Sequence, residues 1–172
     1  MSGELEKLNR ASAEIAEADF LNCCGSRKWA RKMTAARPFV DADELLFQAV
    51  QIWQNLEAED WLEAFAAHPK IGAKKGDTKQ SARFAEWSRS EQSGVSAATD
   101  STLDELAEAN RLNERKFGFI FIVCAAGKSA EEMLDICRRR LSNDADTEIR
   151  IAADEQRKIT EIRLKKLLET RI

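Results

Sequence analysis

One apolar run, from Phe117 to Ala125, is the only stretch of this chain with the pattern of a buried strand. Over so short a run, periodicity cannot separate a buried strand from a buried helix. No second strand-like run exists to pair with it, and a lone strand leaves its backbone hydrogen bonds unsatisfied. We therefore expect a buried helix or an extended segment packed among helices, in a fold without a sheet.

The remainder of the chain favours helix. Only two prolines and seven glycines occur in 172 residues, while Ala, Glu, Leu, Arg and Lys are abundant. Apolar residues recur at helical spacing, and stop and cap signals such as Gly25 and Ser26 separate the segments. The first expected helices span residues 4–18 and 27–36, with a break over 20–25, and a third runs from a cap at Asp41 or Asp43 to about 56. Two more span 60–67 and 78–93, and the next is capped by Thr99 or Ser101 and contains Leu112. The last two span 130–141 and a stretch from Asp146 or Thr147 to about 169. We predict an all-α fold, a single-domain bundle of about eight helices covering residues 1–172.

Charge and cysteine content exclude several classes of protein. A net charge of −3 and a pI near 5.4 argue against a nucleic-acid partner bound by phosphate neutralisation. With one histidine and no Cys-x-x-Cys pair no zinc spacing can be built, so we expect no metal and reduced, structural cysteines, including the adjacent Cys23 and Cys24. No apolar run approaches the 18 residues of a membrane-spanning helix, and the first residues lack the apolar core of a signal peptide. The last residues are not the peroxisomal signal Ser-Lys-Leu. We expect a soluble, cytoplasmic protein with no membrane partner.

The single histidine, His68, lies directly before Pro69. Proline disfavours the α region for the residue before it, so His68 is expected where the helix over 60–67 stops. The ring would then project from a helix end beside a basic loop that begins at Lys70. Imidazole is suited to proton transfer near neutral pH, which makes His68 a candidate acid–base residue. A surface or hydrogen-bonded structural histidine is the alternative.

A polar cluster follows on the helix predicted over 78–93. Ser88, Glu91 and Gln92 share one helical face, because side chains three and four residues apart lie together. A hydroxyl, a carboxylate and an amide would suit a substrate rich in N–H and C=O groups, and a carboxylate near an imidazole is a usual acid–base partnership. The alternative is a solvated helix end before Gly94.

Arg163 is a third candidate, beside the apolar residues of the last predicted helix. Its spacing relative to Ile159 and Leu167 permits a guanidinium that faces inward and binds a planar anionic or carbonyl-bearing ligand. The alternative is a solvated arginine, or one paired with a glutamate of the same helix.

Five ordered blocks of this chain together resemble the bacterial type of the 2-oxo-4-hydroxy-4-carboxy-5-ureidoimidazoline (OHCU) decarboxylase family. They are Phe20–Phe39 with Cys-Cys-Gly-Ser, Asp60–Gly72 with His-Pro-Lys-Ile-Gly, Trp87–Gly94 with Trp-Ser-x-x-Glu-Gln-x-Gly, Lys116–Ser129 with Lys-Phe-Gly-Phe-Ile-Phe-Ile-Val, and Glu155–Leu167 with Glu-Gln-x-Lys-Ile-x-x-x-Arg-Leu. The blocks cover nearly the whole chain. Asn113 departs from the pattern, because an aromatic residue is expected ahead of the Lys-Phe-Gly block.

The resemblance implies an all-helical, homodimeric, cofactor-free enzyme of urate breakdown, which releases CO2 from the ureidoimidazoline substrate to give (S)-allantoin. It implies that His68 is the catalytic histidine and that Glu91, rather than Glu86, is the carboxylate that works with it. The residues implied to bind the substrate are Pro69, Ser88, Gln92, Phe119, Ile120, Phe121, Ile122, Val123 and Arg163, with the backbone of 119–123 making contacts. No phosphate-loop pattern is present, consistent with the absence of a nucleotide cofactor. The alternatives are an enzyme of the same fold that acts on another ureido compound and a non-catalytic helical binding protein.

Overall fold

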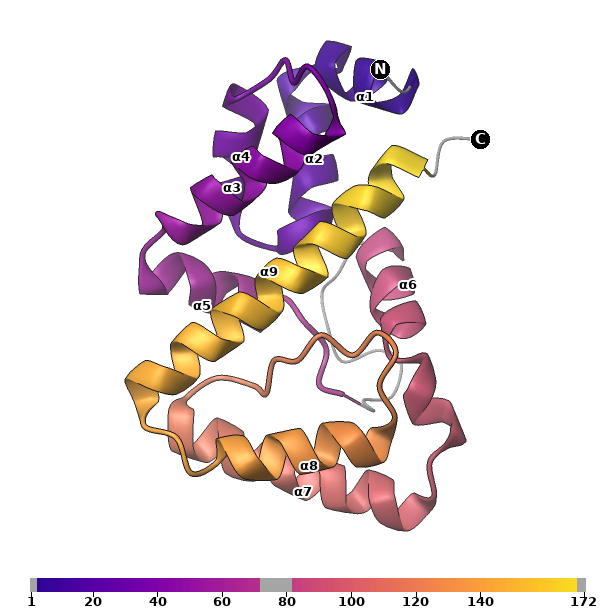
Figure 1. Cartoon of the computed structure of the whole chain (residues 1–172), viewed down its shortest axis with the longest axis vertical. Coiled ribbons are helices and arrows are strands. Elements are labelled where there is room, and N and C mark those ends of the chain that lie inside the picture. The colour runs from indigo at the N-terminus through magenta and orange to yellow at the C-terminus, as the bar shows by residue number, and fades with distance from the viewer. Residues whose placement is uncertain (1–2, 72–81, 170–172) are drawn as a thin grey trace. The chain divides into compact units, whose positions relative to one another are not determined.

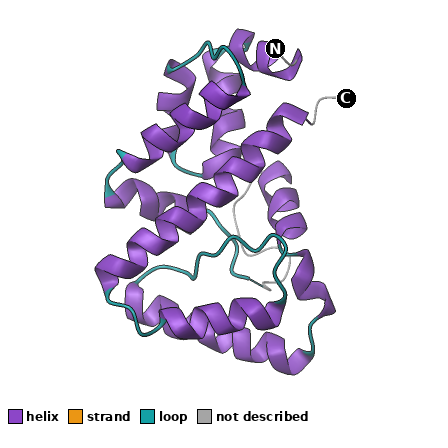
Figure 2. Cartoon of the chain, in the orientation of Figure 1, coloured by secondary structure: helices purple, strands orange, loops and turns teal. Residues whose placement is uncertain are grey.

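The computed structural model describes residues 3–71 and 82–169. Within these residues the chain is all-α, with nine α-helices, one short 3-10 helix and no strand (Figures 1 and 2). The helices are α1 (Gly3–Arg10), α2 (Ala13–Cys24), α3 (Arg27–Ala35), α4 (Ala42–Gln54), α5 (Ala58–Ala66), α6 (Ala82–Glu91), η1 (Ser93–Ala97), α7 (Asp100–Phe117), α8 (Ala130–Arg140) and α9 (Ala145–Glu169). The predicted fold class is confirmed.

The chain forms two compact units. The first unit comprises the residues up to Ala64 and those from Arg157 onward, and the second comprises Phe65–Gln156. The helices α5 and α9 each contribute residues to both. None of the helices in the described ranges has the length and apolarity needed to cross a bilayer.

The first unit is built around aromatic side chains that helix packing buries. In this unit α2 packs against α3, and α3 packs against α4. The ring of Phe20 meets those of Trp29 and Phe39 edge-on, at centroid distances of 5.9 and 6.4 Å. The Trp29 indole also donates a hydrogen bond of 3.1 Å to the Ala49 carbonyl, so its one polar group is satisfied while the ring is fully buried.

The second unit has a separate core, in which α7 packs against α8. Leu106, Phe121, Val123, Met133 and Cys137 belong to this core and are almost fully buried. Two of these five residues come from the apolar run that was singled out in the sequence. The run leaves α7 at Gly118, which adopts a left-handed φ of +82°, and it continues to Ala125 without helix or strand. Of the two conformations expected for it, the buried helix is therefore wrong, and the segment is non-helical.

The start of the chain is where the predicted helix boundaries are wrong. One helix over 4–18 and a break over 20–25 were expected, whereas α1 ends at Arg10 and α2 continues through Phe20 to Cys24. The break falls at Ser12, whose side chain accepts a hydrogen bond from the Ile15 N–H and so begins a new helix. As predicted, Gly25 ends α2 with a left-handed φ of +77° and Ser26 caps α3.

Most other helix limits agree with the sequence signals. Asp41 and Thr99 cap α4 and α7, and a full capping box formed by Ser129 and Glu132 begins α8. The helix predicted to begin at Thr78 is described only from Ala82, and most of the predicted basic loop lies outside the described residues.

Candidate active site

His68 lies just beyond the end of α5, as its place before Pro69 predicts. The last helical residue is Ala66, and the His68 N–H closes a turn by donating to the Phe65 carbonyl at 3.1 Å. Phe65 anchors this end of the helix, because its fully buried ring packs against Phe119 at a centroid distance of 5.3 Å. The half-buried imidazole is therefore placed by a helix end with little freedom to shift.

The imidazole has two neighbours that define its orientation. Its Nε2 lies 2.6 Å from Oε1 of Gln156, a fully buried side chain on α9. Its ring also packs against Phe84 of α6, at a centroid distance of 5.4 Å. Gln156 belongs to one of the five sequence blocks, but no motif or spacing assigned it a role. The available signal was a polar residue within the buried stripe of α9, between Ala152 and Ile159.

The helix that contacts His68 also carries the predicted polar cluster. Phe84, Ser88 and Glu91 are separated by four and three residues, so they share one face of α6. Phe84 and Ser88 are buried and Glu91 is half-buried, whereas Glu86 is exposed. The face of α6 that packs on the imidazole is thus the face that presents the Ser88 hydroxyl and the Glu91 carboxylate. A solvated helix end does not describe this cluster.

Three side chains hold the non-helical segment after α7 by its backbone. The Cys124 N–H donates to the Glu155 carboxylate at 2.7 Å, and Lys128 Nζ donates to the Cys124 carbonyl at 2.8 Å. Arg140 Nη1 donates to the carbonyl of Ile122 at 2.7 Å. These bonds use two alternate residues of the segment, and they substitute for the sheet partner that the segment lacks.

Backbone hydrogen bonds are fewer earlier in the segment. Within the described part of the chain, the backbone of Phe119, Ile120, Phe121 and Val123 takes part in no hydrogen bond, and Ile122 uses only its carbonyl. Because buried backbone groups without partners are costly, this stretch favours a ligand that supplies both N–H and C=O groups.

Burial disfavours thiol chemistry at Cys124. It raises the pKa of the Cys124 thiol, against lowering effects of the Ala126 backbone hydrogen bond and of Lys128, and the carboxylates of Glu155 and Glu91 add smaller raising effects. The thiol stays protonated at neutral pH and is a poor nucleophile. The same interactions place Glu91 and Glu155 in the electrostatic surroundings of the segment.

Three predicted substrate residues remain. Pro69 is half-buried directly after His68, and Gln92 is half-buried directly after α6. Arg163 belongs to the first unit, where its side chain is fully buried on α9, seven residues and so two turns after Gln156. A solvated arginine is therefore excluded for this position.

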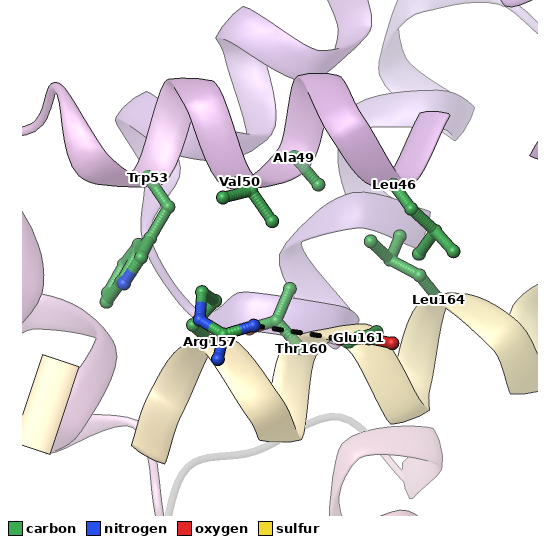
Figure 3. A pocket seen from close by; sticks show the side chains of 8 residues that line it. All are labelled: Leu46, Ala49, Val50, Trp53, Arg157, Thr160, Glu161 and Leu164. Carbon is green, nitrogen blue, oxygen red and sulfur yellow. Dashed lines mark ion pairs between the residues drawn. The ribbon is translucent and has the colours of Figure 1, made fainter. Parts of the chain in front are cut away.

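A cavity of about 30 Å³ lies between α4 and α9 of the first unit (Figure 3). Its walls are the side chains of Leu46, Ala49, Val50, Trp53, Arg157, Thr160, Glu161 and Leu164. This volume holds about one water molecule. None of the predicted site residues lines it, and it is too small for an imidazoline ring.

Comparison with known proteins gives a consistent result. Residues 9–165 match the model of the OHCU decarboxylase family. The chain is 46% identical over 156 residues to the uric acid degradation bifunctional protein TTL of Arabidopsis thaliana, which covers 90% of this chain but 48% of that protein. It therefore spans about half the length of that relative. It is 27% identical over 161 residues to a 2-oxo-4-hydroxy-4-carboxy-5-ureidoimidazoline decarboxylase of Haloferax volcanii, covering 93% of each chain.

A solved structure supports the same assignment. A crystal structure of OHCU decarboxylase in the presence of (S)-allantoin is similar, with a TM-score of 0.77, 41% identity, and coverage of 92% of this chain and 99% of that one. Sequence and fold agree over almost the whole length. The chain belongs to the OHCU decarboxylase family.

Proposed function

We propose that this protein catalyses the decarboxylation of 2-oxo-4-hydroxy-4-carboxy-5-ureidoimidazoline to (S)-allantoin and CO2, without a cofactor. Family membership supports the reaction. The observation that supports the proposal for the site is that His68, Ser88, Glu91 and the Phe119–Val123 segment belong to one compact unit, in which Phe84 of α6 packs on the imidazole and Phe119 packs on Phe65.

The substrate chemistry fits these residues. Loss of CO2 from the hydroxyl-bearing ring carbon leaves an electron pair that delocalises through the adjacent ring C=N bond, so the substrate accommodates the charge itself and the ureido-bearing carbon gains the proton. The protein must orient and desolvate the carboxylate, stabilise the developing oxyanion and deliver a proton to one face of the carbon. Side chains and backbone groups are sufficient for these tasks.

In this proposal His68 and Glu91 perform the acid–base steps. His68 orients the departing carboxylate or the substrate hydroxyl and acts in proton transfer. Glu91, on the helix face that packs on the imidazole, supports His68 or the protonation of the carbon. Glu86 has no part in the reaction, because it is exposed.

The remaining residues bind the substrate. The backbone groups of Phe119, Ile120, Phe121, Ile122 and Val123 complement the N–H and C=O groups of a ureido substituent. Ser88 and Gln92 add side-chain hydrogen bonds, and Pro69 forms part of the wall. The guanidinium of Arg163 counters negative charge on the ring oxygen.

We also infer that residues 1–172 act as one OHCU decarboxylase-like domain, and that the enzyme is a cytoplasmic homodimer with neither nucleic acid nor membrane as a partner. The resemblance to the family supports the dimer, and the acidic net charge of −3 argues against a nucleic-acid partner. Sedimentation of the purified protein at micromolar concentration measures its oligomeric state, and a monomer would contradict this inference.

The reaction is tested by oxidising and hydrolysing urate in situ and following the substrate by its ultraviolet absorption. Addition of the protein is expected to speed the loss of substrate far beyond its spontaneous decay, with release of CO2. Decay at the spontaneous rate would overturn the proposal.

Ligand binding separates the proposal from its two alternatives. Thermal unfolding with (S)-allantoin, (R)-allantoin and other ureido compounds compares their affinities. We expect stabilisation by (S)-allantoin in particular. Stronger stabilisation by another ureido compound would favour a different substrate, and ligand binding without any turnover would favour a binding protein.

A further inference from the structure

We propose that Gln156 is a positioning residue, which holds the imidazole of His68 with a proton on Nε2 and so makes Nδ1 the nitrogen that exchanges protons. The catalytic consequence rests on the proposed function, whereas the tautomer itself does not. The resemblance to the family assigns no role to Gln156. Its role follows from the contact between its amide, near the middle of α9, and the imidazole of His68.

The hydrogen bond defines the proton position. Nε2 of His68 lies 2.6 Å from Oε1 of Gln156, and an amide oxygen has no proton to give. The ring nitrogen must therefore be the donor. The other neutral tautomer, with its proton on Nδ1, would direct the Nε2 lone pair at the lone pairs of this oxygen, which is repulsive.

The surroundings of Gln156 keep it in this role. Its side chain is fully buried, so breaking the bond would remove a hydrogen bond from a desolvated amide, which is costly. Phe84 packs against the imidazole ring and limits its rotation. One residue earlier on the same helix, Glu155 holds the Cys124 N–H at 2.7 Å, so this turn of α9 positions both the histidine and the backbone segment.

The consequence for chemistry follows from the two protonation states that this contact allows. The neutral ring with Nε2–H and the imidazolium both satisfy Gln156, and they differ only at Nδ1. The proton that His68 gains and loses is thus the one on Nδ1. A glutamine, being neutral, fixes the tautomer without the added negative charge of a carboxylate partner.

The single histidine of this chain makes the tautomer directly measurable. Protein labelled with [15N]histidine gives one imidazole spectrum, in which a protonated nitrogen and one with a free lone pair have well-separated shifts. For the neutral ring of the wild-type protein we expect a protonated Nε2 and an unprotonated Nδ1. For Gln156→Met, which keeps the length of the side chain but removes the acceptor, we expect a mixture of both tautomers and a kcat reduced by ~10²-fold.

Two further variants make the test specific. Gln156→Glu restores an acceptor at the same position and is expected to return Nε2 to its protonated state. Asn113→Leu removes another fully buried amide of the same unit and should leave both the tautomer and kcat unchanged. Comparing the three variants distinguishes the loss of this contact from the general cost of losing a buried amide.

The results have clear meanings. A wild-type imidazole protonated on Nδ1, or a Gln156→Met protein that keeps the pure Nε2–H tautomer and wild-type kcat, would overturn the inference. An Nε2–H tautomer that is lost in Gln156→Met supports the positioning role, even in a protein that does not decarboxylate the ureidoimidazoline. Failure of the proposed function is thereby distinguished from failure of this inference.

Discussion

Gly94 has no room for a side chain. A Cβ at this position would lie 2.1 Å from the backbone carbonyl oxygen of Lys128, far inside van der Waals contact. Lys128 in turn holds the Cys124 carbonyl, so this close approach joins the end of the α6 region to the backbone segment of the site. Glycine is required here because a side chain does not fit, and not because of a left-handed φ.

We therefore expect Gly94→Ala to lower the free energy of unfolding by about 1–3 kcal/mol, because two backbones must move apart. The same shift would displace Glu91 and Gln92 and reduce kcat. Gly3→Ala is the control, because nothing lies within 4 Å of an added Cβ there. Urea unfolding and kcat of both variants test the argument, and equal behaviour of the two would contradict it.

Asn113 is the position where the family pattern led us to expect an aromatic residue. It is fully buried on α7, and neither polar atom of its side chain has a hydrogen-bond partner in the described ranges. A buried amide in that condition lowers stability by about 1–3 kcal/mol.

Replacement by leucine, which has a similar branched shape, should raise the free energy of unfolding by a comparable amount, about 1–3 kcal/mol, and leave activity unchanged. Chemical denaturation of Asn113→Leu measures the change. A clear loss of stability would show that the amide is satisfied in solution.

Single residues also define the limit of what the sequence predicted for the site. His68 was located correctly because a proline fixes where the helix ends, a purely local effect. The choice of Glu91 over Glu86 needed the family pattern, and burial of the two side chains agrees with it. Gln156 was missed because its partner lies 88 residues away, and local spacing carries no signal for such a contact.

At the scale of elements, the segment from Phe119 to Cys124 depends on side chains from α8 and α9. Arg140 is central among them: it is buried, its Nε donates to Glu148 at 2.9 Å, and its guanidinium lies 4.8 Å from the centre of the Phe121 ring. The fully buried carboxylate of Glu148 also accepts from Asn143 at 3.1 Å. These contacts hold the segment in position, as hydrogen bonds to a neighbouring strand would in a sheet.

Removing Arg140 should therefore be costly. Arg140→Met leaves the Glu148 carboxylate buried without its cation, for which we expect a loss of about 3–5 kcal/mol in unfolding free energy. The exposed pair of Arg138 and Glu105 provides the control, and Arg138→Met should cost less than about 1 kcal/mol. Similar losses in the two variants, measured by denaturation, would contradict the role given to Arg140.

Elements with local signals were predictable and those without were not. The capping residues of α3, α4, α7 and α8 determined their starts because a side chain and the first turn suffice for a cap. The boundary between α1 and α2 was placed wrongly because helical spacing runs through it, and only the capping bond of Ser12 interrupts the helix. The non-helical path of 118–125 could not be chosen over a helix, since polar groups that hold it come from distant parts of the sequence.

At the scale of the whole molecule, the buried thiols link stability to pH. All four cysteines are buried, and burial raises the pKa of Cys24 to about 12 and that of Cys137 to about 11, from an ordinary value of 9.0. Below pH 9 these thiols are protonated in both the folded and the unfolded chain, and their contribution to stability is complete. Between pH 9 and about 11–12 the unfolded chain loses these protons first, so stability falls as pH rises.

We expect the free energy of unfolding to be lower at pH 10 than at pH 8, by about 1 kcal/mol for each of the two thiols. Urea unfolding at both pH values measures the difference. In Cys24→Ala the contribution of one thiol is absent, so the decrease should be smaller by that amount. An unfolding free energy that stays constant or rises from pH 8 to pH 10 would contradict the prediction.

We propose that His68, placed at the end of α5, carries out the decarboxylation chemistry. The most direct test is circular dichroism of allantoin formation, with urate oxidised and hydrolysed in situ before the protein is added. The account predicts a fast rise of one enantiomer, (S)-allantoin, with the wild-type protein. It predicts no acceleration with a His68→Asn variant that unfolds at the wild-type temperature. A His68→Asn protein that produces (S)-allantoin at the wild-type rate would contradict the account.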